Sequence, residues 1–259
     1  IYSTGTANIS STNFVNNFVD LDAGAVYLGG SSKLTSNIFT SNTAYQNGGA
    51  VYISALPSKK TAVNINKNNF YQNTANNGGA VYADKGKIGI NSSNFGSTTM
   101  LGNTATGDSG KGGAIYVADT AVEDDYVNDN VTTLKSNKFA QNTATDGGAL
   151  YNAGTVALVK NTFGLTDKAK NTYINAATNG GAVYNDGKLT DSGSTIAYNT
   201  AEKGGALYNN GVITSYNKKN VLTGGLNSTK INYNSADMGG GIYNSNILAT
   251  SKASFTGNI

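Results

Sequence analysis

Residues 73–82 read Asn-Thr-Ala-Asn-Asn-Gly-Gly-Ala-Val-Tyr, and close copies of this stretch return along the whole chain. The stretch holds no residue type that usually performs chemistry. Seven of the eight internal copies end in Gly-Gly, a small residue, an aliphatic residue and Tyr, whereas the first copy, at 23–27, replaces one glycine with Ala23. Self-similarity of this kind indicates a repeat architecture.

The tyrosine that closes each copy gives the length of the repeat. Consecutive tyrosines are 24 to 35 residues apart, which predicts a unit of about 24 to 25 residues with insertions in some copies. A second motif precedes each copy and places an apolar residue three positions before an Asn. These pairs are Phe14/Asn17, Phe39/Asn42, Phe70/Asn73, Met100/Asn103, Phe139/Asn142, Ile196/Asn199, Ile231/Asn234 and Phe255/Asn258. Near Phe163 the pattern is stretched, so we expect an insertion at 164–171, before Asn175.

The segments between these motifs alternate in hydrophobicity, as in Val63-Asn64-Ile65 and Val156-Ala157-Leu158. Alternation is the signature of β-strands, and no sustained helical periodicity is present. Short strands separated by Gly and Asn turns predict an all-β fold, a right-handed single-stranded parallel β-helix of about nine to ten coils with loop insertions. We expect residues 1–259 to form a single β-helix segment. Both ends fall inside a repeat, so we expect truncation from a longer repeat array.

Stacking of the coils explains why each position of the repeat keeps its residue type. The few large inward side chains of one coil contribute about 1.5 to 3 kcal/mol each when buried, which does not offset about 1 to 2 kcal/mol for each ordered residue. Coils stacked about 4.8 Å apart give every inward residue a like neighbour. We expect aliphatic and aromatic columns, and turn asparagines that adopt a left-handed conformation and pass amide hydrogen bonds along a ladder. This structural Asn ladder comprises Asn17, Asn42, Asn73, Asn103, Asn142, Asn199 and Asn234.

The repeated tyrosines are the candidate binding residues. The aliphatic residue before each tyrosine points inward, so alternation places the tyrosine on the outer face. Phenol rings with free hydroxyls suit sugars or peptide backbones. The alternative is that the rings stack on one another for stability alone. The candidate residues are Tyr27, Tyr52, Tyr82, Tyr116, Tyr151, Tyr184, Tyr208 and Tyr243, with Tyr2 as a truncated first member.

The insertions form a second candidate contact surface. They lie at 54–62, 107–111, 117–131 and 215–227 and interrupt an otherwise regular repeat. Loops that protrude from a regular body often carry binding specificity.

The composition leaves few tools for catalysis. His, Cys, Trp and Arg are all absent. We therefore expect no catalytic residue, no cofactor and no enzyme activity. We also expect no metal site, although one acidic cluster offers oxygen ligands that suit Ca²⁺, namely Glu123, Asp124, Asp125 and Asp129.

The charge and hydropathy patterns limit the classes of partner that the chain can bind. The formal net charge is +3 and the 18 lysines are scattered along the sequence, so we expect neither a basic face nor nucleic-acid binding. No apolar run reaches the length of a membrane helix, so we expect membrane contact only through flanking regions.

The alternation of Gly-Gly-Ala-(Val/Ile/Leu) with Phe-x-x-Asn, as in 70–73 followed by 78–81, resembles the paired repeats of chlamydial polymorphic outer-membrane proteins. It also resembles adhesin-like surface proteins of some bacteria and methanogenic archaea. The resemblance implies a secreted or surface-displayed, autotransporter-like stalk that contacts other cells.

We therefore expect an extracellular or cell-surface adhesin segment, a rigid scaffold whose loops and tyrosine stripe bind cell-surface glycans or proteins. One alternative is self-association, as a structural subunit or stalk of a filament or surface layer. The other is a polysaccharide lyase or hydrolase, because such enzymes also use parallel β-helices.

Overall fold

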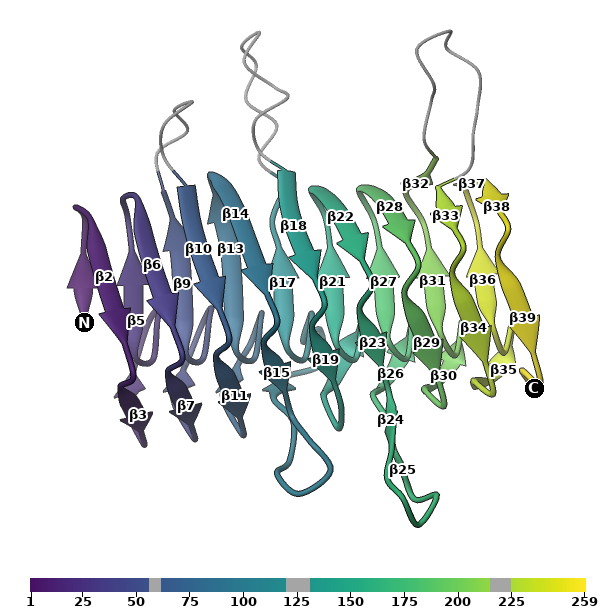
Figure 1. The fold of residues 1–259 in the computed structure, drawn as a ribbon, viewed down its shortest axis with the longest axis horizontal. Coiled ribbons are helices and arrows are strands. Elements are labelled where there is room, and N and C mark those ends of the chain that lie inside the picture. Colours follow the sequence, from purple (N-terminus) through teal and green to yellow (C-terminus); the bar gives the residue numbers. More distant parts are fainter. Residues whose placement is uncertain (56–61, 120–130, 215–224) are drawn as a thin grey trace, which may run out of the picture.

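The computed structural model describes residues 1–55, 62–119, 131–214 and 225–259. Apart from one hairpin, every described strand belongs to one of four parallel sheets, which we call sheets A to D in the order in which each coil visits them. The chain coils nine times from one end of a rod to the other (Figure 1). The predicted parallel β-helix is confirmed. The described residues include no helix, and hence none that is long and apolar enough to cross a membrane.

Sheet A carries the aliphatic and tyrosine positions of the Gly-Gly-Ala motif. Its strands align equivalent residues, for example Val81 with Ile115 and Tyr82 with Tyr116. The nine strands are β1 (Tyr2–Ser3), β5 (Val26–Leu28), β9 (Val51–Ser54), β13 (Val81–Lys85), β17 (Ile115–Val117), β21 (Leu150–Asn152), β27 (Val183–Asn185), β31 (Leu207–Asn209) and β36 (Ile242–Asn244).

Sheet B contains the alternating segments and faces the viewer in Figure 1, above sheet C. Its main strands are β2 (Ala7–Ser10), β6 (Ser32–Thr35), β10 (Ala62–Asn66), β14 (Lys87–Asn91), β18 (Val131–Lys135), β22 (Thr155–Val159), β28 (Lys188–Ser192), β32 (Val212–Ile213) and β37 (Ile247–Leu248). β33 (Leu226–Asn227) and β38 (Thr250–Ser251) complete it. β32 and β33 both pair with β28, so they share one strand position of the coil. The insertion predicted at 215–227 begins after β32, but its last two residues form β33 and belong to the sheet.

Sheet C carries the aromatic column. Rings from Phe14 to Phe163 stack with centroids 4.5–4.9 Å apart. The nine strands are β3 (Asn13–Val15), β7 (Ile38–Thr40), β11 (Asn69–Tyr71), β15 (Asn94–Phe95), β19 (Lys138–Phe139), β23 (Thr162–Phe163), β29 (Thr195–Ala197), β34 (Lys230–Asn232) and β39 (Ser254–Thr256).

The assignment of Met100 as the apolar residue of the motif before Asn103 is wrong, because Met100 does not take part in this column. Phe95 takes the place, between Phe70 at 4.7 Å and Phe139 at 4.9 Å. Met100 lies in a loop at 96–102 that separates Phe95 from Asn103. The loop happens to place Met100 three residues before Asn103, so the sequence pattern selected Met100 in place of Phe95.

Sheet D is the narrow side of the coil and carries the Thr-Ala positions that follow the Asn ladder. Its eight strands are β4 (Phe18–Val19), β8 (Thr43–Ala44), β12 (Thr74–Ala75), β16 (Thr104–Ala105), β20 (Thr143–Asp146), β26 (Ala176–Asn179), β30 (Thr200–Lys203) and β35 (Ser235–Met238). An antiparallel hairpin, β24 (Leu165–Thr166) and β25 (Thr172–Tyr173), leaves the rod before Asn175. It accounts for the insertion predicted near Phe163 and projects at the lower edge in Figure 1.

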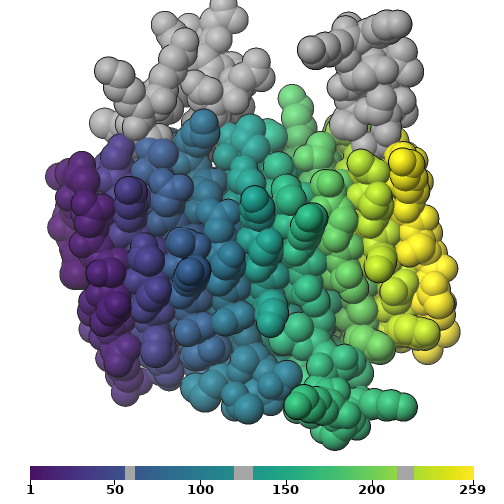
Figure 2. Space-filling model, in the orientation of Figure 1, coloured from purple at the N-terminus to yellow at the C-terminus, as the bar shows by residue number. Residues whose placement is uncertain are grey.

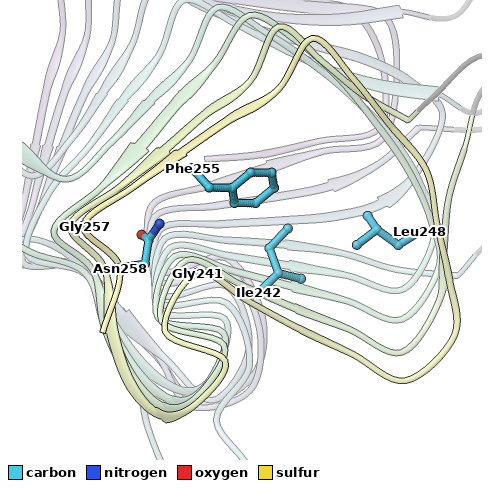
Figure 3. Close-up of a pocket in the computed structure, with 6 residues that line it drawn as sticks. All are labelled: Gly241, Ile242, Leu248, Phe255, Gly257 and Asn258. Atoms are coloured by element: carbon cyan, nitrogen blue, oxygen red, sulfur yellow. The ribbon is translucent and has the colours of Figure 1, made fainter.

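The core runs the length of the rod and is filled from three sheets. At the C-terminal end, Ile242 of sheet A, Leu248 of sheet B and Phe255 of sheet C point toward one another (Figure 3). In the middle coils the equivalent side chains, such as Val81, Ile88 and Phe95, are buried. Ile65 and Phe70 of the third coil likewise have no exposed surface.

The insertions are described only in part. The predicted insertion at 107–111 forms a turn between β16 and β17. The other three predicted insertions hold residues 56–61, 120–130 and 215–224, which lie outside the described part of the chain.

Candidate binding surface: the tyrosine stripe

The repeated tyrosines form one continuous column on the outer side of sheet A. Neighbouring ring centroids lie 4.4–5.4 Å apart, and neighbouring ring planes are within 16° of parallel. The column, which we call the tyrosine stripe, contains Tyr2, Tyr27, Tyr52, Tyr82, Tyr116, Tyr151, Tyr184, Tyr208 and Tyr243. The structure therefore brings together every tyrosine singled out in the sequence.

Stacking determines which part of each ring a ligand can reach. Each internal ring has a neighbour on both faces, so its edge and its hydroxyl group are the parts left for contact. Most of these side chains are half-buried, Tyr151 is 4% exposed and Tyr2, at the end of the column, is 74% exposed. The stripe therefore presents a row of phenol edges rather than the open ring faces that stack on sugars.

Carboxylates border the stripe. The Tyr151 hydroxyl donates a hydrogen bond to Asp186 Oδ2 at 3.1 Å. The Ser54 hydroxyl donates to Asp84 Oδ2 at 2.8 Å, close to Tyr52 and Tyr82. These acids follow the tyrosines by two residues, at the corner where sheet A ends.

Burial and nearby acids raise the pKa of several phenols in the stripe. Burial is the largest cause that raises the pKa of Tyr52, Tyr82 and Tyr151, and carboxylates add to it. Burial likewise raises the pKa of Tyr184 to about 12, with Asp146 and Asp186 contributing. A phenol has a pKa of about 10 in water. The hydroxyls of these four tyrosines therefore remain hydrogen-bond donors well into alkaline conditions.

Two lysines cover part of the stripe from the side of sheet D. The Lys111 ammonium lies 4.8 Å from the ring centroid of Tyr151, and the Lys203 ammonium lies 5.9 Å from that of Tyr243. These distances fit cation–π contacts. Lys111 also helps to explain why Tyr151 is the most buried ring.

The Asn ladder is present at the corner between sheets C and D, and it is longer than predicted. Each internal side-chain amide donates to the side-chain oxygen of the next Asn and to a backbone carbonyl of the preceding coil. Asn73, for example, donates to Asn103 Oδ1 at 2.8 Å and to Phe39 O at 3.0 Å. Asn175 and Asn258 also belong to it. The ladder asparagines from Asn42 to Asn234 are buried, so they hold the coils together and are not a ligand site.

The expected left-handed conformation belongs to another residue. It falls on the residue before the ladder, such as Ser41 and Gln72, both with φ of 55°, whereas no ladder Asn has positive φ. This arrangement turns the chain sharply and leaves the following Asn free to point inward.

A second buried ladder at the corner between sheets B and C was missed. Asn37 donates from its side chain to Asn68 Oδ1 at 3.0 Å, and Asn137 donates to Asn161 Oδ1 at 3.1 Å. Ser93 fills the position between these two pairs. Asparagines two residues before the phenylalanine, as in Asn37-Ile38-Phe39, were the signal that could have revealed it.

The acidic Ca²⁺ candidates, Glu123, Asp124, Asp125 and Asp129, lie outside the described residues. Within the described ranges, no three acidic side chains approach closely enough to hold a metal ion.

Comparison with known families identifies the repeat. Residues 38–54, 69–84 and 97–118 match the family model of the Chlamydia polymorphic membrane protein repeat. These three segments of the chain are therefore similar to repeats of the polymorphic membrane protein type. Proteins of this family are associated with the outer membrane and the cell surface, which supports a cell-surface location in general terms. Comparison with curated proteins and with solved structures gave no significant match.

Proposed function

We propose that the chain is a segment of a cell-surface adhesin, a rigid rod that presents the tyrosine stripe and the insertions to glycans or proteins of another surface. The observation that supports this proposal is the uninterrupted stripe of nine stacked rings along sheet A. A stripe that repeats at the strand spacing of about 4.8 Å suits an extended ligand. Many individually modest contacts along such a ligand add up to useful affinity.

The chemistry of the stripe favours a polar, hydrogen-bonding ligand. The ring faces are occupied by neighbouring rings, and the phenols stay protonated at neutral pH. The bordering carboxylates, such as Asp84 and Asp186, accept hydrogen bonds. Sugar hydroxyls or backbone amides can use both kinds of group.

Phenylalanine substitutions test this proposal because they remove the hydroxyls and keep the stacked rings. We expect Y82F/Y116F/Y184F to bind target cells at least about tenfold more weakly than the native chain, since each lost hydrogen bond is worth about 0.5 to 1.5 kcal/mol. Binding is measured by flow cytometry with the labelled chain, and folding by circular dichroism.

The matched control is Y198F/Y233F. These two rings stack on each other at 5.5 Å but lie away from the stripe. Equal cell binding by the native chain and the stripe variant would contradict a role for the hydroxyls. Fibres that grow with concentration under electron microscopy would favour the filament alternative, and release of unsaturated or reducing sugars would favour an enzyme.

A further inference from the structure

Acidic and basic residues that are scattered in the sequence lie on different sides of the rod. The described residues of sheets B and C, and of the corner between them, contain a single acid, Asp191, whose side chain is buried in the core. The remaining described acids lie on sheets A and D, at their corners or on the hairpin. They are Asp20, Asp22, Asp84, Asp108, Asp119, Asp146, Asp167, Asp186, Glu202 and Asp237. The expectation that the chain has no basic face is therefore wrong.

Lysines gather where the acids are missing. Six exposed lysines surround the corner between sheets B and C, and we call this set the basic edge. It consists of Lys67, Lys135, Lys138, Lys160, Lys230 and Lys252. Lys33 adds a further exposed charge on the outer side of β6. Residues far apart in sequence meet on one edge because successive residues of this corner are 24 to 44 positions apart, the length of one coil with its insertions.

The corner itself shows a regular order. One residue of each coil occupies it with positive φ, in the order Ser11, Ser36, Lys67, Ser92, Ser136, Lys160, Gly193, Ser228 and Lys252. Lysine therefore occupies the third, sixth and ninth coils, roughly 14 Å apart at about 4.8 Å per coil. Lysine in a left-handed conformation is uncommon. The corner projects these side chains from the rod, with serine hydroxyls between them.

The basic edge runs straight along the rod. Figure 1 views the molecule onto it, with sheet B above and sheet C below, and Figure 2 shows the same side as a continuous surface. Lys138 and Lys230 approach it from sheet C, and Lys135 from sheet B. A linear partner can therefore contact several lysines at once.

The residues of the basic edge select the class of anion. Lysine ammonium groups pair with sulfate or carboxylate as point charges, and the intervening serines can bond to sugar hydroxyls. The described corner column and the two outward columns beside it hold no aromatic side chain, so the edge has nothing on which nucleic-acid bases could stack and no aromatic anchor for a lipid interface. We propose that the basic edge binds a linear anionic polysaccharide that lies along the rod axis. This surface is separate from the tyrosine stripe and does not depend on it.

A triple serine variant tests the proposal with the least disturbance of the fold. K67S/K160S/K252S introduces the residue that the same column carries in five other coils. We expect its affinity for immobilised heparin, a sulfated polysaccharide, to fall at least about tenfold, because each lysine beside an anionic surface contributes measurably. Binding of the native chain should weaken as salt is raised, since salt screens exposed charges.

The control variant removes the same charge elsewhere. K85S/K168S/K170S changes three exposed lysines outside the basic edge, and we expect heparin binding within about twofold of the native chain. Equal losses in both variants would show that only net charge matters and would overturn the proposal. Stronger binding to duplex DNA or to phosphatidylserine vesicles than to heparin would overturn it too.

Two further readouts complete the test. Polygalacturonate carries carboxylates and no sulfate, so its affinity compared with that of heparin shows whether the edge prefers one anion. Release of the chain from immobilised heparin by either soluble polysaccharide supports the proposal. Absence of heparin binding by the native chain would overturn the proposal. If the native chain does not bind heparin but still binds cells through the stripe hydroxyls, the proposed adhesin function is retained.

Discussion

The two glycines of the repeat have different tasks. The first, such as Gly78, adopts φ of 60°, a conformation that Ala23 also adopts in the first copy with φ of 66°. The second, such as Gly79, packs against the next coil, where a Cβ atom would lie 2.2 Å from Gly113 O. The first copy replaces the glycine that sets conformation and keeps Gly24, whose Cβ would lie 2.0 Å from Gly49 O. Close approach between coils is therefore the stricter requirement.

Gly79→Ala should destabilise the rod more than Gly78→Ala. The added methyl at position 79 meets backbone atoms of Thr104 and Gly113 in the layer stacked on its own. We expect a loss of about 3 kcal/mol or more in the free energy of unfolding. Gly78→Ala should cost about 1 to 2 kcal/mol, the penalty of a left-handed alanine. Its methyl meets Val81 O at 2.3 Å within the same turn, a contact that the turn around Ala23 accommodates. Urea denaturation measures both, and equal losses would contradict the distinction.

Asp191 places a carboxyl group in the core. Its strand neighbours in the same column are Leu158 and Leu226, and it accepts hydrogen bonds from the hydroxyls of Ser194 and Thr229. Burial raises the pKa of Asp191, although these hydrogen bonds oppose the shift. The folded state therefore holds this proton more tightly than the unfolded chain does.

The sign of the pH effect follows from that shift. The contribution of Asp191 to stability is complete below the ordinary carboxyl pKa of about 3.9 and is lost as the pH rises through the higher pKa of the folded state. We expect Asp191→Asn, which stays neutral, to lose less stability than the native chain between mildly acidic and neutral pH. Urea denaturation across this range checks it. Parallel pH profiles for the two chains would show that Asp191 does not titrate differently on folding.

At the scale of the element, the Asn ladder acts as a continuous hydrogen-bonded column. Asn142 Oδ1 accepts from the backbone and the side chain of Asn103, at 2.8 and 3.0 Å. Its own amide donates to Asn175 Oδ1 at 2.8 Å and to Phe95 O at 2.9 Å. Every internal ladder residue thus donates and accepts hydrogen bonds and links three coils.

Asn142→Ala should be among the most damaging changes in the chain. It removes the side-chain hydrogen bonds to Asn103, Asn175 and Phe95 and leaves the buried backbone N–H of Asn103 without an acceptor. We expect a loss of about 3 kcal/mol or more in the free energy of unfolding. The control is Asn94→Ala, whose amide makes one half-exposed bond to Asn69 Oδ1 at 2.8 Å. That variant should lose about 1 kcal/mol or less. Chemical denaturation compares them, and similar losses would show that the ladder adds nothing beyond ordinary hydrogen bonds.

The sequence predicted those elements whose residues repeat in type and spacing. The tyrosine stripe and most of the Asn ladder could be read directly, because stacking selects the same residue at each level. Phe95 was missed because an inserted loop broke its spacing to Asn103. The basic edge was missed because Lys67, Lys160 and Lys252 occur in only one coil of three. Their shared edge becomes visible only when the coils are superposed.

At the scale of the whole molecule, the rod is a one-dimensional stack in which each coil contacts its neighbours. The phenylalanine column illustrates the consequence, since Phe39 to Phe163 are fully buried whereas Phe255 in the last coil is 51% exposed. A coil in the middle is stabilised from both sides and a coil at the end from one. Stability in such arrays is close to a sum of coil terms and interface terms.

The rate of amide hydrogen exchange should therefore decrease from the ends of the rod toward its centre. We expect the slowest exchange in β15, β19 and β23, which lie in the fourth to sixth coils, and the fastest in β3 and β39. The backbone ladder is equally complete in these inner strands, so the difference reports the cost of opening a coil with two neighbours rather than one. Exchange measured by mass spectrometry on peptides from each coil resolves the gradient. Uniform protection along the rod would mean that the nine coils open as one cooperative unit and would contradict the additive description.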